Sequence, residues 1–178
     1  DWSQAGRLLA SASSDNTVRV WEPNLGLLMI AKGPTSSVER VSWRPDGMRI
    51  AAGTQAGRLF VWNYGIKTLT GQKRPINQVT WSPDGQTIAS TSMSSDIRLW
   101  KMPEGSAITS PKLNKDKASL VVWDSKSKQL ASDSQDGVIR LWRFSPSLSP
   151  QDLWSKNKQF IQTMSWNPNN TRLAILTA

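Results

Sequence analysis

The sequence contains neither cysteine nor histidine. Without them the chain can form no disulfide, no thiolate or imidazole metal site, and no Ser-His or Cys-His catalytic pair. The phosphate-binding patterns G-x-x-x-x-G-K-[ST] and G-x-G-x-x-G are also missing, and no apolar run approaches the roughly 18 residues of a membrane span. We therefore expect a non-enzymatic protein without cofactor or metal and with no membrane contact. The lack of cysteine suits a reducing compartment, the cytoplasm, with the nucleus as the alternative.

Tryptophan is abundant, and its spacing is regular. Four pairs are each 19 residues apart: Trp2 with Trp21, Trp43 with Trp62, Trp81 with Trp100, and Trp123 with Trp142. The first members of successive pairs lie 41, 38 and 42 residues apart, and Trp166 follows 43 residues after Trp123. Since length varies only outside the Trp-to-Trp block, the spacing predicts a structural repeat whose packed part tolerates no insertion.

Each repeat has the pattern of short strands separated by turns. Runs such as "TIAS" and "RLFVW" are too short for helices, and "RPDG" (44–47), "SPDG" (82–85) and "NPNN" (167–170) are hairpin turns. A unit then has a strand ending at the first tryptophan, a second strand, a third ending at the second tryptophan, and a weaker fourth. About seventeen strands, four to each repeat of some 40 residues, predict an all-β fold of stacked four-stranded antiparallel β-propeller blades, with the tryptophans between blades. The predicted units are 1–35, 36–74, 75–116, 117–158 and 159–178.

These residues resemble the WD40 repeat family, whose pattern runs "L-A-S-x-S-x-D" and then "I-R-L-W". The first match comprises Leu9, Ala10, Ser11, Ser13, Asp15, Val18, Arg19, Val20 and Trp21. The others comprise Ile88, Ala89, Ser90, Ser92, Ile97, Arg98, Leu99 and Trp100, and Leu130, Ala131, Ser132, Ser134, Asp136, Ile139, Arg140, Leu141 and Trp142. The second unit is looser, with Ala56 in place of the aspartate and Phe60 in place of the arginine.

The chain departs from that family in two dipeptides. Family members usually carry Gly-His before the first strand and an aspartate after the last tryptophan, whereas this chain has no histidine and continues with Glu22, Asn63, Lys101 and Arg143. The resemblance therefore implies a tryptophan-rich variant in which the family's buried Asp, His, Ser/Thr and Trp network is never complete and apolar packing replaces it. Family members typically have seven blades, so we expect the chain to be part of a longer propeller or to complete a ring with other copies.

Charge is concentrated in the loops that enter the first strand of each unit. The chain has 22 Lys and Arg against 13 Asp and Glu, a net charge of +9. The loop cations are Lys32, Lys73, Arg74, Lys112, Lys115, Lys117, Lys156 and Lys158, against the single anion Asp116. In a propeller these loops open on one face, together with the turns between second and third strands, which predicts a basic face for an acidic protein surface or for nucleic acid. The alternative is that these lysines serve solubility alone.

The remaining polar residues have structural interpretations. Asp46 and Asp84 are predicted turn residues, and Asp15 and Asp136 are expected to accept bonds from backbone amides. Arg19, Arg98 and Arg140 are expected to pack on the tryptophans two residues later. Asn169-Asn170-Thr171 is a glycosylation sequon that coincides with a hairpin turn.

The sequence thus predicts a scaffold that binds a partner protein through its basic, loop-rich face. Family resemblance places the contact at the residues just before the second turn of each unit, Ser14, Gln55, Met93 and Gln135, beside the basic loops. Two alternatives stay open: a nucleic-acid-binding module that uses the same face, and the regulatory or sensor propeller of a larger signalling protein. No aromatic residue other than Phe160 lies close to these loops, so a stacking platform for single-stranded bases is poorly supported.

Overall fold

The computed structural model describes residues 1–62, 65–94, 96–109, 117–144, 148–155 and 161–177. In this part of the chain all regular structure is β, and the seventeen strands form five antiparallel sheets. No helix of the described residues is long and apolar enough to cross a membrane. The all-β prediction and the expected strand number are confirmed.

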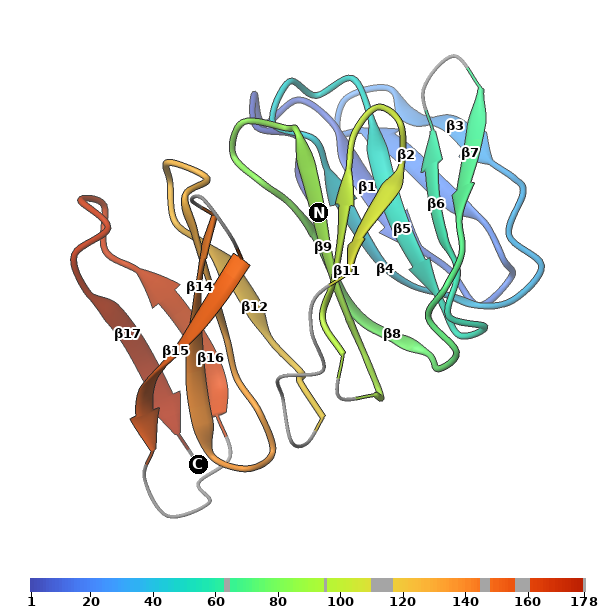
Figure 1. Cartoon of the computed structure of the whole chain (residues 1–178). Helices are drawn as coiled ribbons and strands as arrows, with labels where there is room; N and C mark the ends of the chain where they lie inside the picture. Colours follow the sequence, from blue (N-terminus) through green and yellow to red (C-terminus); the bar gives the residue numbers. More distant parts are fainter. Residues whose placement is uncertain (63–64, 95, 110–116, 145–147, 156–160, 178) are drawn as a thin grey trace.

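The sheets follow one another along the chain without crossover, as the repeat predicts (Figure 1). The first sheet contains β1 (Leu9–Ala12), β2 (Val18–Glu22) and β3 (Gly26–Ala31). The second contains β4 (Val38–Trp43), β5 (Ile50–Thr54), β6 (Leu59–Trp62) and β7 (Ile66–Leu69). The third contains β8 (Ile76–Trp81), β9 (Thr87–Ser92), β10 (Arg98–Lys101) and β11 (Ser106–Thr109). The fourth contains β12 (Val121–Trp123), β13 (Gln129–Ser132), β14 (Val138–Phe144) and β15 (Leu148–Ser155), and the fifth contains β16 (Ile161–Trp166) and β17 (Leu173–Thr177).

The hairpins have the geometry that their turn residues predict. Gly47 and Gly85 have φ of 70° and 66°, a left-handed conformation that costs glycine nothing. Asn170 adopts the same conformation, with φ of 58°, in the turn without glycine. Ser127 does so in the turn that has neither proline nor glycine, with φ of 58°. The register therefore recurs: Trp43 pairs with Ile50, as Trp81 pairs with Ile88.

The buried tryptophans pack between neighbouring sheets, as predicted. The interfaces join Trp43 and Trp62 with Ala10, Val18 and Val20, Trp81 and Trp100 with Leu59 and Val61, and Trp142 with Ala89 and Leu99. Each buried tryptophan contributes up to about 4–6 kcal/mol by its area. Trp2 lies at the start of the first sheet and is 51% exposed.

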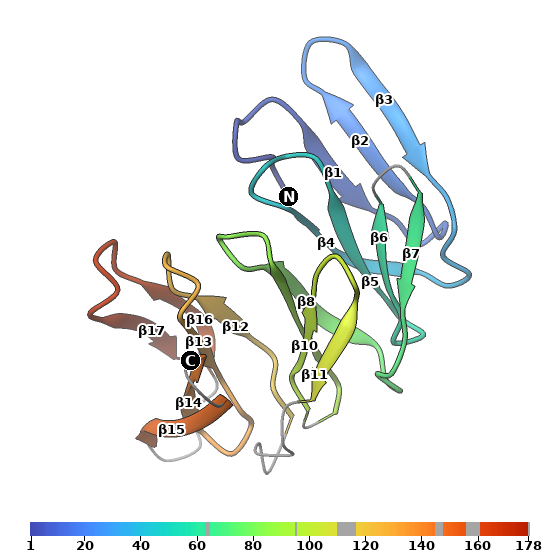
Figure 2. The ribbon, with the colours of Figure 1, turned by 45° about the horizontal axis from the view of Figure 1, so that its top comes forward.

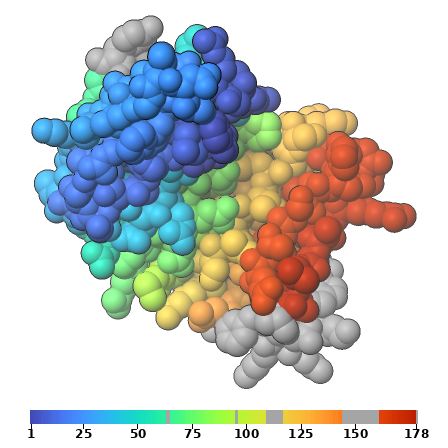
Figure 3. Space-filling view, turned by 180° about the vertical axis from the view of Figure 1, so that it is seen from behind, coloured from blue at the N-terminus to red at the C-terminus, as the bar shows by residue number. Residues whose placement is uncertain are grey.

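The sheets are arranged as an open arc around their first strands. β4 contacts β8, and β8 and β16 both contact β12, so the first strands of these four sheets line the inner side. β1, whose register corresponds to that of the second strands β5 and β9, contacts β4. Figure 2 shows the other strands fanning outward, with β3 and β7 toward the rim. In the space-filling view the N-terminal sheet and the C-terminal sheet lie on either side of the middle of the chain (Figure 3). The arc is that of propeller blades, and the described sheets do not close it into a ring.

Candidate partner-binding face

Two kinds of loop meet at one end of the sheets. The turn between the second and third strands donates a backbone N–H to the loop that enters the first strand of the same sheet. The bonds run from Gln55 to the Ser37 carbonyl (2.9 Å), from Met93 to the Pro75 carbonyl (3.2 Å) and from Gln135 to the Lys117 carbonyl (2.9 Å). Because the bond recurs in three consecutive sheets, the turn and the entering loop lie together at the same end of each of these sheets.

We call the surface at this end of the sheets the basic loop face and define it by its described members. The exposed turn residues are Ser14, Gln55, Met93 and Gln135, and the cations are Lys32, Lys73 and Arg74, all exposed, with Lys117 half-buried. Of the other predicted site residues, Lys112, Lys115, Lys156 and Lys158 lie outside the described residues. Sequence reasoning missed Arg58, an exposed cation in the turn after β5. The sequence could have indicated it, because Arg58 directly follows the predicted turn in "TQAGR" (54–58).

The aspartates near this face are engaged by arginines of their own strands. Asp136 accepts from Arg140 at 2.8 Å, Asp96 accepts from Arg98 at 3.2 Å, and Asp15 pairs with Arg19. Within the described residues no ion pair is recorded for Lys32, Lys73 or Arg74. Asp15, Asp96 and Asp136 are thus neutralised by arginines of their own strands, whereas the side chains of Lys32, Lys73 and Arg74 are exposed to solvent.

These ion pairs correct the expectation for the three arginines. Their guanidiniums lie against aspartates, because a carboxylate two or four residues earlier offers a stronger, charge-assisted partner than an indole ring. A guanidinium does lie over a tryptophan elsewhere: Arg44 is 5.8 Å from the ring centroid of Trp81 in the next sheet.

The turn carboxylates act as predicted. Asp46 and Asp84 accept from the backbone N–H groups of Met48 (2.9 Å) and Gln86 (3.0 Å). Asp15 and Asp136 likewise accept from Thr17 and Val138, at 3.0 Å each. These four carboxylates therefore hold turns. Asn169 of the sequon accepts from Thr171 within its own hairpin turn.

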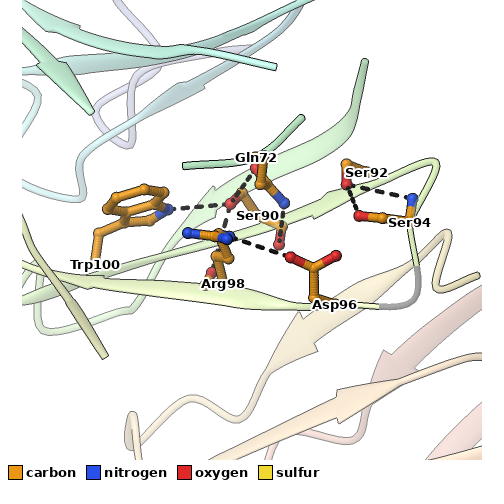
Figure 4. A network of polar contacts seen from close by, with 7 residues as sticks. All are labelled: Gln72, Ser90, Ser92, Ser94, Asp96, Arg98 and Trp100. Carbon is orange, nitrogen blue, oxygen red and sulfur yellow. Dashed lines mark hydrogen bonds and ion pairs between the residues drawn. The ribbon is translucent and has the colours of Figure 1, made fainter. Parts of the chain in front are cut away.

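A buried polar network lies beneath the face (Figure 4). Trp100 Nε1 donates to Ser90 Oγ at 3.1 Å, and Ser90 Oγ donates to Gln72 Oε1 at 3.0 Å. Gln72 is 5% exposed, and its Nε2 reaches the Ser90 carbonyl at 3.4 Å. Gln72 follows Gly71, so this dipeptide stands where the family has Gly-His. Glutamine supplies a donor and an acceptor as neutral imidazole does, without its titration.

The same indole bond recurs in other sheets. Trp21 and Trp142 donate to Ser11 and Ser132, both at 2.8 Å. In the second sheet Ala52 stands at the serine position, and Trp62 donates instead to the Lys32 carbonyl at 3.2 Å. The expectation that apolar packing replaces the network is therefore corrected for three sheets: histidine is absent, but the Trp-Ser bond persists in them and gives the indole N–H an acceptor.

Asp133 fixes an entering loop in the fourth sheet. Its Oδ1 accepts from the backbone N–H groups of Ser119 and Leu120, both at 2.7 Å. The side chain is buried, and burial raises the pKa of its carboxyl despite these two bonds. Asp133 thereby holds the loop that contains Lys117 against the sheet.

The face aspartates predict how stability responds to acid. Hydrogen bonds from Thr17 and Ser13 hold the pKa of Asp15 well below its usual range. Burial alone would raise the pKa of the Asp96 and Asp136 carboxyls. Hydrogen bonds outweigh burial, so both pKa values lie below the usual range. These bonds come chiefly from Ser94 and Arg98 to Asp96 and from Arg140 to Asp136. The unfolded chain, with carboxyl pKa near 3.8, then binds more protons than the folded chain. The stability these groups contribute is present above about pH 4 and is lost as the pH falls below it.

We expect a variant with Asp15, Asp96 and Asp136 all changed to Asn to be less stable than the natural sequence at pH 7. The difference should shrink steadily between about pH 4 and pH 2, because protonation removes the same interactions from the natural sequence. Urea unfolding of both proteins across this range measures it. Asp133 is unchanged in both, so its opposite pH dependence cancels. A difference that stays constant with pH would contradict the assignment.

Stacked antiparallel sheets, three of them with a Trp-Ser bond between neighbouring strands, define a protein of the β-propeller class, built of repeats. The family model of the WD domain, G-beta repeat (WD40) matches residues 1–22, 26–63 and 65–101, more than half of the chain. The chain belongs to the WD40 repeat family. WD40 domains are typically non-enzymatic scaffolds, and their repeats generally mediate protein-protein interaction. No curated protein matches the sequence.

Proposed function

We propose that this protein is a non-enzymatic scaffold that binds a partner protein with an acidic surface through the basic loop face. The observation that supports the proposal most directly is the charge imbalance of that face. Lys32, Lys73 and Arg74 are exposed, while Asp15, Asp96 and Asp136 are held by arginines. An unopposed cluster of cations attracts an acidic surface and speeds its association.

The turn residues give this attraction a shaped surface. Ser14, Gln55, Met93 and Gln135 occupy equivalent positions in four sheets, and the last three are anchored by a backbone bond to the entering loop. Met93 is 48% exposed and adds an adaptable apolar contact. Rigid sheets below and varied side chains above are the arrangement of a binding scaffold.

The arc itself has uncovered end faces. Leu9 and Trp21 are half-buried in the first sheet, whereas the equivalent residues Ile88 and Trp100 of the third sheet are 0% and 2% exposed. We propose that further blades of the same polypeptide, or other copies, cover these end faces and complete the ring, since stacking is what buries them elsewhere in the arc.

Charge reversal tests the basic loop face. We expect Lys73→Glu combined with Arg74→Glu to reduce partner recovery at least tenfold in a pull-down from native lysate, because both side chains then repel an acidic surface. The matched control is Lys126→Glu with Lys128→Glu, which makes the same charge change in the exposed turn after β12. Equal loss in both variants would show that net charge alone acts.

Nuclease treatment separates protein binding from the alternative. The net charge of +9 also suits nucleic acid, and counterion release would make such binding fall steeply with salt. A protein that stays bound after nuclease and is lost only from the Lys73 and Arg74 variant supports the scaffold. Recovery that disappears with nuclease assigns the same face to nucleic acid.

A further inference from the structure

The first sheet exposes an unusual concentration of large apolar side chains along its outer strand. Five neighbours in sequence are exposed: Leu25 (72%), Leu27 (45%), Leu28 (49%), Met29 (43%) and Ile30 (44%). All but Leu25, which lies in the preceding turn, belong to β3. We call these five residues the β3 patch. Contiguous exposed apolar surface of this kind marks an interaction site more often than single exposed residues do.

β3 is also a free strand edge. It is paired on one side with β2, and no described strand pairs with its other side. Edge strands are commonly protected by charge, by proline or by a bulge. β3 has no charged residue and no proline. It does have a bulge: Met29 pairs with Val20 and Leu27 pairs with Trp21, so Leu28 between them has no partner on β2. The bulged Leu28 is itself an exposed apolar residue, so the bulge does not replace apolar surface with polar surface.

A neighbouring blade would not cover this strand. β7 is the corresponding outer strand of the second sheet, which lies between two other sheets, and its Ile66 is still 54% exposed. The two strands differ in composition, since β7 carries Lys67 and Thr68 where β3 is apolar throughout. Ring closure therefore leaves the β3 patch exposed, and its occupant is a separate molecule.

The size and charge of the patch indicate what binds there. It comprises five side chains, far fewer than the roughly 20–30 residues that each partner contributes to a stable protein dimer. Two copies, each with a net charge of +9, would also repel one another. A single added strand fits better, because backbone hydrogen bonds supply affinity that the apolar area alone does not.

The ends of β3 differ in charge. Glu22 of β2 pairs with Gly26 at the start of β3, and exposed Lys32 directly follows its last residue, Ala31. A strand added antiparallel would begin near Lys32 and end near Glu22. Its complement is an acidic residue, then a short apolar segment, then a basic residue.

We propose that β3 is a second docking site, which shares only Lys32 with the basic loop face and at which an extended apolar segment of a partner protein adds to the sheet edge. The segment is preceded by an acidic residue and followed by a basic one.

A labelled peptide tests this proposal with the whole chain. The probe is fluorescein-Glu-Ile-Val-Thr-Val-Ile-Lys-amide, and its control has the two charged ends exchanged. Fluorescence anisotropy at low salt should show saturable binding of the probe, with the control at least threefold weaker. Leu28→Lys combined with Ile30→Lys should weaken probe binding at least tenfold, since both side chains are exposed and charge is introduced at the edge.

Ile66→Lys is the matched control variant, because it places the same kind of charge on an exposed apolar position of β7. It should leave probe binding unchanged. The absence of saturable binding, or equal weakening by Ile66→Lys, overturns the proposal. Light scattering measures whether the natural chain is a monomer or a dimer. If it is a dimer and the Leu28→Lys, Ile30→Lys variant is a monomer, the occupant of β3 is a second copy of this chain and the proposal is wrong. The Lys73→Glu, Arg74→Glu variant should bind the probe normally. A failure of the β3 proposal can therefore be told apart from a failure of the proposal for the basic loop face.

Discussion

Trp100→Ala should lower the free energy of unfolding by about 3–5 kcal/mol, the range for truncating a buried tryptophan. Trp100 is 2% exposed and packs between the second and third sheets. Its removal leaves a cavity and also takes away the indole N–H that donates to Ser90 Oγ. The Ser90 hydroxyl in turn donates to Gln72 Oε1. Since domains are stable by only about 5–15 kcal/mol, the variant should unfold at a much lower urea concentration.

Two comparisons separate packing from hydrogen bonding. Trp2→Ala removes the same atoms from a side chain that is 51% exposed, so it should cost far less. Ser90→Ala keeps the indole in place but leaves its N–H and the Gln72 amide without the hydroxyl, at about 1–3 kcal/mol. If Trp2→Ala destabilised as much as Trp100→Ala, the tryptophans would not act as contacts between blades.

The repeat could be predicted from sequence because tryptophan spacing and turn residues report local geometry. Gly47 and Asn170 occupy the left-handed turn positions that their conformational preferences indicate. The strand pattern followed because each unit repeats the same packing requirement. These features depend on a few neighbouring residues, so they can be recognised along the chain alone.

The polar partners could not be predicted as well, because they depend on contacts between distant segments. Gln72 meets Ser90 across 18 residues, and Trp62 reaches the Lys32 carbonyl across 30. Strand alternation places each arginine on the same side as a tryptophan, but the turn brings Asp136 back against Arg140. The exposure of β3 could not be predicted either, because its sequence "GLLMIA" has the composition of a buried strand.

Gly57→Ala should be among the most damaging substitutions near the basic loop face. Gly57 has φ of +74°, and a Cβ there would lie 2.6 Å from the Gln72 carbonyl oxygen and 2.7 Å from that of Arg74. Both contacts are with backbone, so the loop that carries Lys73 must move. Backbone strain of about 1–2 kcal/mol and overpacking of about 1–3 kcal/mol together predict a loss of about 2–5 kcal/mol.

Gly47→Ala isolates the two effects. Gly47 has nearly the same φ, +70°, but nothing lies within 4 Å of the position that an alanine Cβ would take, so this variant should show the conformational cost alone, about 1–2 kcal/mol. Urea unfolding measures both losses, and the excess for Gly57→Ala reports the clash with the loop. Partner binding supplies an independent readout, because displacement of residues 72–74 should weaken it in Gly57→Ala while Gly47→Ala binds normally. Equal losses of stability and unchanged binding in both variants would mean that the turn after β5 does not position the basic loop, and the face would then owe its shape to the sheets alone.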